Sequence, residues 1–174
     1  MDVYIAEKYL SAHHKMGVCD EKGNGIYQIS GKVISVGRKM FIADMQGNEL
    51  LYLHQKVLAF TPHCVLEKNG EEIAEVERKF GLHKNFAIKG LDWTVEGDLG
   101  GHEYTGLDSE GQAVFTVKNK WFEWGDTYHL WVRDDIDVVT CIGIVVAFDI
   151  SEDEEQAGEA GAIGEAVGGL LSHT

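Results

Sequence analysis

The sequence predicts a mainly β protein, built as a sandwich or a closed barrel of ten to twelve short strands. Three observations predict it. A hairpin motif occurs four times, the residues after it alternate between apolar and polar, and glycine is abundant while proline is nearly absent. The chain has 174 residues, of which 21 are Gly and one is Pro. Glycine adopts the positive φ angles of tight turns, so this composition favours short strands joined by turns.

The repeated motif consists of an acid, a glycine, two aliphatic residues and a lysine, each three residues after the one before. The four copies are Asp20, Gly23, Ile26, Ile29, Lys32; Asp44, Gly47, Leu50, Leu53, Lys56; Glu67, Gly70, Ile73, Val76, Lys79; and Asp108, Gly111, Val114, Val117, Lys120. An acid before a glycine is typical of turns, because its carboxylate accepts hydrogen bonds from nearby backbone N–H groups. Each copy is therefore expected to form a β-hairpin, with the acid and the glycine in the turn.

Alternating residues follow each predicted turn. After the first copy, Tyr27 and Ile29 alternate with Gln28 and Ser30. A period of two residues is typical of a strand with one buried face. The segments that link the hairpins add further strands, which accounts for the predicted number.

The segment Val138–Phe148 does not follow this pattern, because it is apolar on every face except for Thr140. Its β-branched residues favour a buried strand. A helix that is apolar all round is equally compatible, provided that it lies inside the protein. A helix of twelve residues is about 18 Å long, roughly the height of a small barrel. The residues alone leave both alternatives open. A bilayer crossing needs about 20 residues, so we expect no transmembrane span.

The charge of the chain is uneven. The formal net charge is −14, and residues 151–174 hold six acids with no Lys or Arg. An acidic chain argues against a nucleic-acid-binding groove. The tail is rich in Glu, Gly and Ala, which favours a flexible acidic segment, with a short docking helix as the alternative. Residues 1–150 are only moderately acidic and leave room for a local basic patch.

No residue pattern points to catalysis or to a cofactor. The three cysteines, Cys19, Cys64 and Cys141, are far apart and lack a C-x-x-C pair, which excludes a disulfide framework or a zinc site of the usual spacing. His63 and Cys64 are adjacent in a predicted strand and therefore point to opposite faces. We expect no catalytic residues, no metal and no cofactor. The chain start lacks the pattern of a signal peptide, so a cytoplasmic protein is expected.

Several segments resemble the LURP-one-related family. They are the repeated hairpins, the run from Gly31 to Met40, Trp93–Gly97, Trp124–Tyr128 and the apolar stretch that ends in Ala147, Phe148 and Asp149. The family is similar in fold to the tubby C-terminal domain and to phospholipid scramblases. The resemblance implies a closed twelve-stranded tubby-like barrel over residues 1–150, threaded by a central buried apolar C-terminal helix. On this basis Val138–Phe148 is the helix, and residues 151–174 are a flexible tail.

The lysines of the repeat are the candidate binding residues. If the hairpins are equivalent units, their second strands run the same way and Lys32, Lys56, Lys79 and Lys120 end near one rim. Arg38 and Lys39 lie close to them in sequence. Such a basic belt suits an anionic headgroup or a phosphate. The alternative is that lysines at strand ends are solvated residues that protect an edge.

These observations lead to three functional hypotheses. Tubby domains bind phosphoinositides, and scramblases are associated with lipid movement, so the resemblance implies a non-enzymatic binding or membrane-tethering module for an anionic phospholipid. Such a protein is cytoplasmic or bound to the membrane surface. The second hypothesis is a protein-interaction or structural protein without lipid affinity, which contacts its partner through the acidic surface or the tail. The third is an uncharacterised hydrolase.

Overall fold

The structure is a computed structural model of the chain, and it describes residues 1–7, 15–31, 37–56, 63–79, 85–98, 101, 103–122 and 125–151. Of the expected tail, residues 151–174, only Ser151 is described, and it is the last residue of the helix. Lys32 lies outside the described residues.

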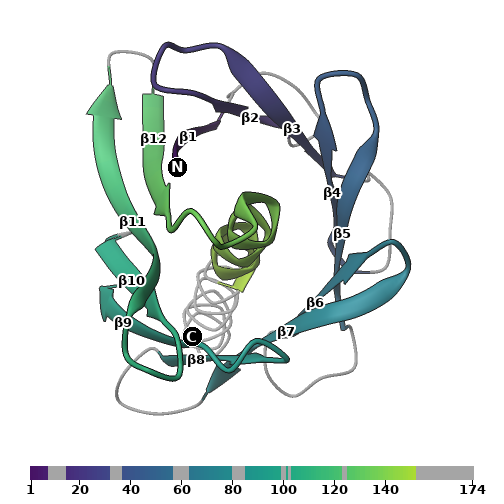
Figure 1. Cartoon of the computed structure of the whole chain (residues 1–174). Helices are drawn as coiled ribbons and strands as arrows, with labels where there is room; N and C mark the ends of the chain where they lie inside the picture. Colours follow the sequence, from purple (N-terminus) through teal and green to yellow (C-terminus); the bar gives the residue numbers. More distant parts are fainter. Residues whose placement is uncertain are drawn as a thin grey trace, which may run out of the picture.

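Twelve strands form one antiparallel sheet that is curled into a nearly closed barrel (Figure 1). In chain order they are β1 (Asp2–Glu7), β2 (Lys15–Cys19), β3 (Gly25–Gly31), β4 (Lys39–Asp44), β5 (Glu49–Gln55), β6 (His63–Lys68), β7 (Glu71–Lys79), β8 (Asn85–Lys89), β9 (Thr94–Asp98), β10 (Glu103–Leu107), β11 (Ala113–Phe122) and β12 (Gly125–Val132). Sequence neighbours pair in the sheet, and β1 pairs with β12. Among the described residues, one isolated bridge joins Ile88 of β8 to Trp93, just before β9, so the two edge strands approach each other without forming a ladder.

A helix occupies the centre of the barrel, which confirms the arrangement that the family resemblance implied. Residues 138–151 are helical, and all of them except Asp149 are buried. The strand alternative for Val138–Phe148 is therefore wrong. A helix that is apolar all round is stable here because strands surround it. Gly143 allows the close approach, since a Cβ there would lie 2.9 Å from Leu66 Cδ2 and 3.0 Å from Leu51 Cδ2.

Three copies of the repeat form the same turn. The Oδ1 atom of Asp20 accepts hydrogen bonds from the backbone N–H groups of Lys22 (2.9 Å) and Asn24 (2.8 Å). Its Oδ2 atom accepts one from the side-chain amide of Asn24 at 2.9 Å. Gly23 donates its N–H to the carbonyl of Asp20 and has a φ of +81°, which explains the need for glycine. The Asp44 and Asp108 turns have the same backbone hydrogen bonds.

The copy that begins at Glu67 forms a different turn, so the expectation that its acid stabilises the turn is wrong. Here β6 continues to Lys68, which pairs with Glu71, and the turn consists of Asn69 and Gly70. Both have positive φ, +56° and +81°, as a two-residue Asn-Gly hairpin requires. The Glu67 carboxylate instead contacts His54 Nε2 at 2.9 Å. The Glu67 side chain is one methylene longer than that of aspartate, which changes where its carboxylate lies. The Asn69-Gly70 turn forms without a hydrogen bond from that carboxylate.

β-Bulges explain why the two aliphatic residues of the repeat are three apart. In a regular strand, residues three apart point to opposite faces. In every copy the register shifts by one residue just after the turn, and the unpaired residue is the first aliphatic one. These residues are Ile26, Leu50, Ile73 and Val114. The extra residue bends the strand and lets both aliphatic residues pack toward the interior. The second aliphatic residue is at most 1% exposed in each copy.

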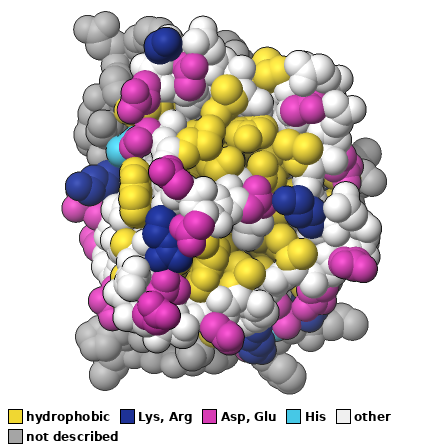
Figure 2. Space-filling view, viewed as in Figure 1, with side chains coloured by type: hydrophobic (Ala, Val, Ile, Leu, Met, Phe, Trp, Pro, Cys, Tyr) yellow, Lys and Arg dark blue, Asp and Glu magenta, His cyan; other side chains and the backbone are white. Residues whose placement is uncertain are grey.

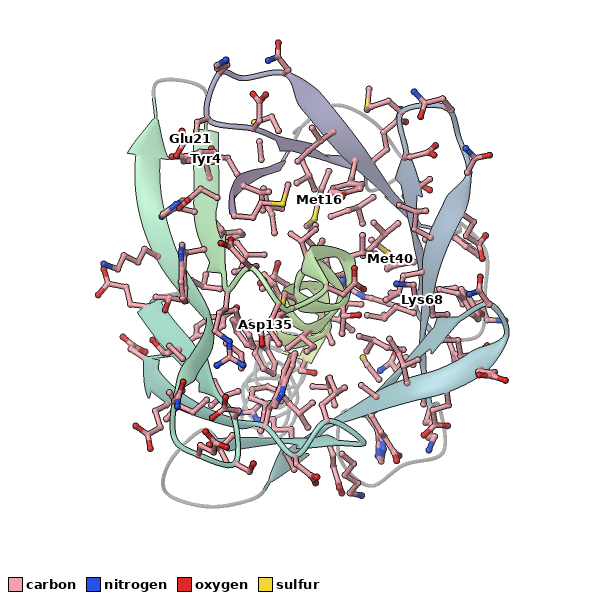
Figure 3. The ribbon with its side chains drawn as sticks, in the orientation of Figure 1. Tyr4, Met16, Glu21, Met40, Lys68 and Asp135 are labelled. Carbon is pink, nitrogen blue, oxygen red and sulfur yellow. The ribbon has the colours of Figure 1, made fainter. Side chains whose placement is uncertain are left out.

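Polar contacts hold the start of the helix in place. Asp137 Oδ2 accepts hydrogen bonds from the backbone N–H and hydroxyl of Thr140, at 3.2 and 2.7 Å, and therefore caps the helix. The same atom contacts Lys68 Nζ at 3.0 Å, and Figure 3 shows Lys68 reaching from the β6–β7 hairpin toward the helix. Partial burial alone raises the pKa of Asp137, but the hydrogen bonds from Thr140 and Lys68 hold it below its ordinary value.

Candidate functional site

The two ends of the barrel differ in the parts of the chain that form them. Because every pair of neighbouring strands is antiparallel, all odd-numbered strands run in one direction. One end, the turn rim, holds the four hairpin turns, the β8–β9 connection and residues 133–137, which lead into the helix. It faces the viewer in Figure 1. The other end, the loop rim, is where the odd-numbered strands finish.

The topology places the predicted lysines that are described at the loop rim. Lys56 follows β5, Lys79 ends β7 and Lys120 lies near the end of β11. Arg38 and Lys39 stand at the start of β4, at the same rim. The side chains of Lys79 and Lys120 lie outside the described part of the structure, so their mutual distances stay a prediction.

Lys56 is held in an ion pair on the outer wall. Its Nζ atom lies 2.6 Å from Glu75 Oε1, and the same oxygen contacts Nε2 of His63. The hydrogen bond from Lys56 holds the pKa of Glu75 below its ordinary value, although partial burial opposes this. Lys39, by contrast, has no acidic side chain within ion-pair distance among the described residues. Lys39 is thus the better candidate for a ligand contact.

Acidic residues gather at the turn rim and basic residues at the loop rim. The acids of the turn rim are Asp2, Asp20, Glu21, Asp44, Glu49, Glu67, Glu71, Glu72, Asp92, Asp108, Glu110, Asp134, Asp135 and Asp137. Its basic residues are Lys22, Lys68 and Arg133. Lys89, at the end of β8, lies opposite Glu75 and pairs with Glu77 at 2.8 Å. Strand ends at the loop rim bear Lys15, Arg38, Lys39, Lys56, Arg78, Lys79 and Lys120, together with the acids Glu7, Glu77, Asp98, Glu103 and Asp126. The charge is therefore divided along the barrel axis.

Half-buried apolar side chains at the turn rim form a feature that the sequence analysis missed. The set consists of Ile26, Leu50, Ile73, Leu91, Trp93 and Ile136, and is called the apolar mouth below. Hydrophobic side chains cover the centre of this face in Figure 2. The signal was present in the repeat, because an aliphatic residue out of step with the alternation marks a bulge near a strand end.

Two candidate nucleophiles lie in the core, on the other side of the barrel wall from the His63–Glu75 pair. Cys64 and Cys141 are fully buried in the core, and burial raises the pKa of the Cys141 thiol to about 12. His63 contacts Glu75 from the opposite face of β6. In the described ranges, no group of three or more His, Cys, Asp or Glu residues is placed to hold a metal ion. Nor does this part of the chain contain a helix with the length and hydrophobicity that a bilayer crossing requires.

Comparison with known proteins gives one family and two similar proteins. A family model described as LURP-one-related matches residues 1–149. The uncharacterized protein YxjI of Bacillus subtilis (strain 168) is 28% identical over 160 residues, which cover 90% of this chain and 98% of the relative. A protein from Arabidopsis thaliana, solved by X-ray crystallography, has a TM-score of 0.63 at 14% identity, with 85% of this chain and 90% of that chain covered. This last similarity concerns the fold alone.

Proposed function

Because the chain belongs to the LURP-one-related family, whose resemblance to tubby domains implies lipid binding, we propose that it is a non-enzymatic module that binds anionic phospholipid headgroups through the loop rim. Lys32, Lys56, Lys79, Lys120, Arg38 and Lys39 are the proposed contacts. The observation that carries the proposal is the common direction of the odd-numbered strands, which brings basic residues far apart in sequence to one end of the barrel.

The net charge of −14 does not oppose this proposal at physiological salt. Strand β5 has 7 residues, so it spans about 23 Å at about 3.3 Å per residue. The Debye length is about 8 Å at physiological ionic strength. The acidic turn rim is therefore more than one Debye length away from a membrane that touches the loop rim. Salt screens the repulsion between the two at that distance. Each lysine near an anionic surface contributes about 1 kcal/mol.

A non-enzymatic role is supported by the positions of the reactive groups. Nucleophilic catalysis needs a base within hydrogen-bond reach of the nucleophile. The core thiols of Cys64 and Cys141 face away from the His63–Glu75 pair, which lies on the outer wall. We therefore place the hydrolase hypothesis below the binding hypothesis.

Liposome flotation tests the proposal with a matched pair of double variants. Vesicles of phosphatidylcholine alone are compared with vesicles that also contain phosphatidylserine or a phosphoinositide. We expect flotation with the anionic vesicles only, and its loss in Lys39→Glu with Lys120→Glu. Lys22→Glu with Lys68→Glu makes the same charge change at the turn rim and should float as the parent does, with thermal unfolding as the check that it folds.

Three outcomes contradict the proposal. They are no flotation of the parent protein, equal flotation with neutral vesicles, and equal losses in the two double variants. Inorganic phosphate added in excess distinguishes a free phosphate ligand from a lipid. If phosphate competes at concentrations comparable to the accessible lipid, the ligand is a soluble phosphate compound and the membrane part of the proposal is wrong.

A further inference from the structure

Several apolar side chains at the turn rim remain half-buried, although one residue at the equivalent position of the repeat is fully buried. In the β10–β11 hairpin the bulge residue Val114 is fully buried. The equivalent residues Ile26, Leu50 and Ile73 remain half-buried, although the repeat places them at the same position after the turn. Met45, in the β4–β5 turn, is 47% exposed. A contiguous apolar patch of this kind on a protein surface marks an interaction site.

Carboxylates without basic partners surround the apolar mouth. Glu21, Glu49, Glu71, Glu72 and Asp92 belong to the turns and strand starts of this rim, and all are exposed. Within the described part of the chain, no basic side chain lies at ion-pair distance from any of them. The resulting negative field attracts a positively charged ligand.

Two basic residues of the turn rim, Lys68 and Arg133, are already engaged, while Lys22 stands beside Glu21 in the β2–β3 turn. Lys68 contacts Asp137 at 3.0 Å, and Arg133 contacts Asp108 at 2.8 Å and Asp135 at 2.6 Å. These contacts fix the start of the helix and leave the outer carboxylates uncompensated. A complementary partner therefore has to supply the positive charge together with apolar side chains.

We propose that the apolar mouth is a docking site for a cationic amphipathic segment of a partner protein. Its apolar side chains cover Ile26, Leu50 and Ile73, and its Lys or Arg residues face the carboxylates of the border. This is the arrangement by which an amphipathic helix binds an apolar surface with charge complementarity. The proposal concerns the end of the barrel opposite the proposed lipid contacts and does not depend on them.

Charge favours a cationic partner over three other possible occupants of the apolar mouth, which are the acidic tail, a second copy of the chain and an anionic membrane. The helix runs from the turn rim for 14 described residues, or about 21 Å at about 1.5 Å per residue, so the chain continues from the other end. Residues 152–155, which come next, are all acidic and are repelled by the border of the mouth. Two copies of the chain each carry a net charge of −14, which opposes self-association, and an anionic membrane is repelled as well.

The test uses a synthetic helical peptide of Leu and Lys, about 18 residues long, with the leucines on one face. Binding is measured by fluorescence anisotropy of the labelled peptide and mapped by two-dimensional NMR of the full-length ¹⁵N-labelled protein. We expect shifts of the backbone signals of Ile26, Leu50 and Ile73 and of the Trp93 indole. A scrambled Leu/Lys peptide has the same charge without the apolar face and should bind about tenfold more weakly. A Leu/Glu peptide should not bind.

Matched variants test the site itself. Glu71→Lys with Glu72→Lys should weaken binding about tenfold or more, whereas Glu96→Lys with Glu103→Lys, away from the mouth, should change it less than about twofold. Leu50→Ser tests the apolar part, and thermal unfolding reports whether each variant folds. Equal effects of the two double variants, binding of the Leu/Glu peptide, or NMR shifts confined to the loop rim would overturn the proposal. A dimer in sedimentation experiments that Leu50→Ser dissociates would also overturn it, because the occupant would then be a second copy.

Discussion

The β4–β5 and β10–β11 hairpins carry the same repeat, yet they contribute differently to the molecule. In both, the backbone N–H of the acid donates across the turn, from Asp44 to Asn48 at 3.0 Å and from Asp108 to Gln112 at 2.9 Å. Both have a bulge at the first aliphatic residue. The bulge residue Leu50 is half-buried, whereas Val114 is fully buried.

The difference comes from neighbours outside the repeat. Arg133 donates its backbone N–H to the carbonyl of Val114 at 3.0 Å, and its guanidinium contacts Asp108 at 2.8 Å. The β10–β11 hairpin thus holds the chain where it passes from the barrel wall to the central helix. The β4–β5 hairpin instead contributes the half-buried Leu50 to the apolar mouth. The repeat therefore sets the geometry of each hairpin, and the neighbouring residues determine what the hairpin contacts.

The largest effect is expected at Gly106 in β10, which lies opposite Phe115 in the β10–β11 hairpin. An added Cβ would lie 2.1 Å from Cε1 of Phe115, a ring in the core with no exposed surface. We expect Gly106→Ala to lower the free energy of unfolding by about 3 kcal/mol, measured by urea denaturation. Gly17→Ala in β2 is the control, because its Cβ meets nothing within 4 Å, and should cost less than about 0.5 kcal/mol. Similar costs for the two variants would disprove the tight contact.

The next effect tests what the two hairpins share. Gly47 and Gly111 have φ angles of +88° and +75°, with open space around an added Cβ. Gly47→Ala and Gly111→Ala should each lower the free energy of unfolding by about 1 to 2 kcal/mol, through backbone strain alone. A difference above about 1 kcal/mol between them in the same urea experiment would show that the two turns are not equivalent.

A smaller effect should separate the two acids. Asp44→Asn and Asp108→Asn both keep a side-chain oxygen that accepts backbone hydrogen bonds. Only Asp108 also pairs with Arg133, so we expect Asp108→Asn to lower the melting temperature more than Asp44→Asn, as followed by circular dichroism. Equal melting temperatures would mean that the ion pair does not help to hold the helix.

The smallest effect is a dependence of stability on pH. Hydrogen bonds from Asn48 to Asp44, and from Arg133 to Asp108, hold the pKa of each carboxyl below its ordinary value of 3.8. Each group therefore stabilises the fold above that value, and the contribution is lost as the pH falls through the lowered pKa. Urea midpoints between about pH 6 and pH 2 should be flat at first and then decline, with a shallower decline in either Asn variant. A decline that both variants leave unchanged would assign it to other carboxyls.

Much of the local structure could be predicted because it depends on neighbours in sequence. The turns at Asp20, Asp44 and Asp108 rest on hydrogen bonds that span two to four residues, and they form as expected. The Glu67 turn could have been distinguished as well, since Asn69-Gly70 is a hairpin signal that needs no carboxylate.

What could not be predicted depends on residues that are distant in sequence. The apolar segment from Val138 fits a helix or a strand equally, and only the surrounding barrel, known from the family resemblance, decides between them. The contacts of Lys68 with Asp137 and of Arg133 with Asp108 join different elements. The spacing of these residues in the sequence does not predict them. The apolar mouth was missed because simple alternation assigns Leu50 to the face opposite Leu51 and Leu53. The bulge at Leu50 turns its side chain toward the interior instead.

The pairing of β1 with β12 has a consequence for the synthesis of the protein. Five residue pairs join these strands, from Asp2 with Trp131 to Ala6 with Thr127, so one edge of the first strand waits for a partner that the ribosome makes more than a hundred residues later. The central helix follows that partner and is made later still. Pairing over such long sequence separations is slow and exposes apolar strand edges while it waits. The nascent chain is therefore expected to need protection from aggregation until its last strand has emerged.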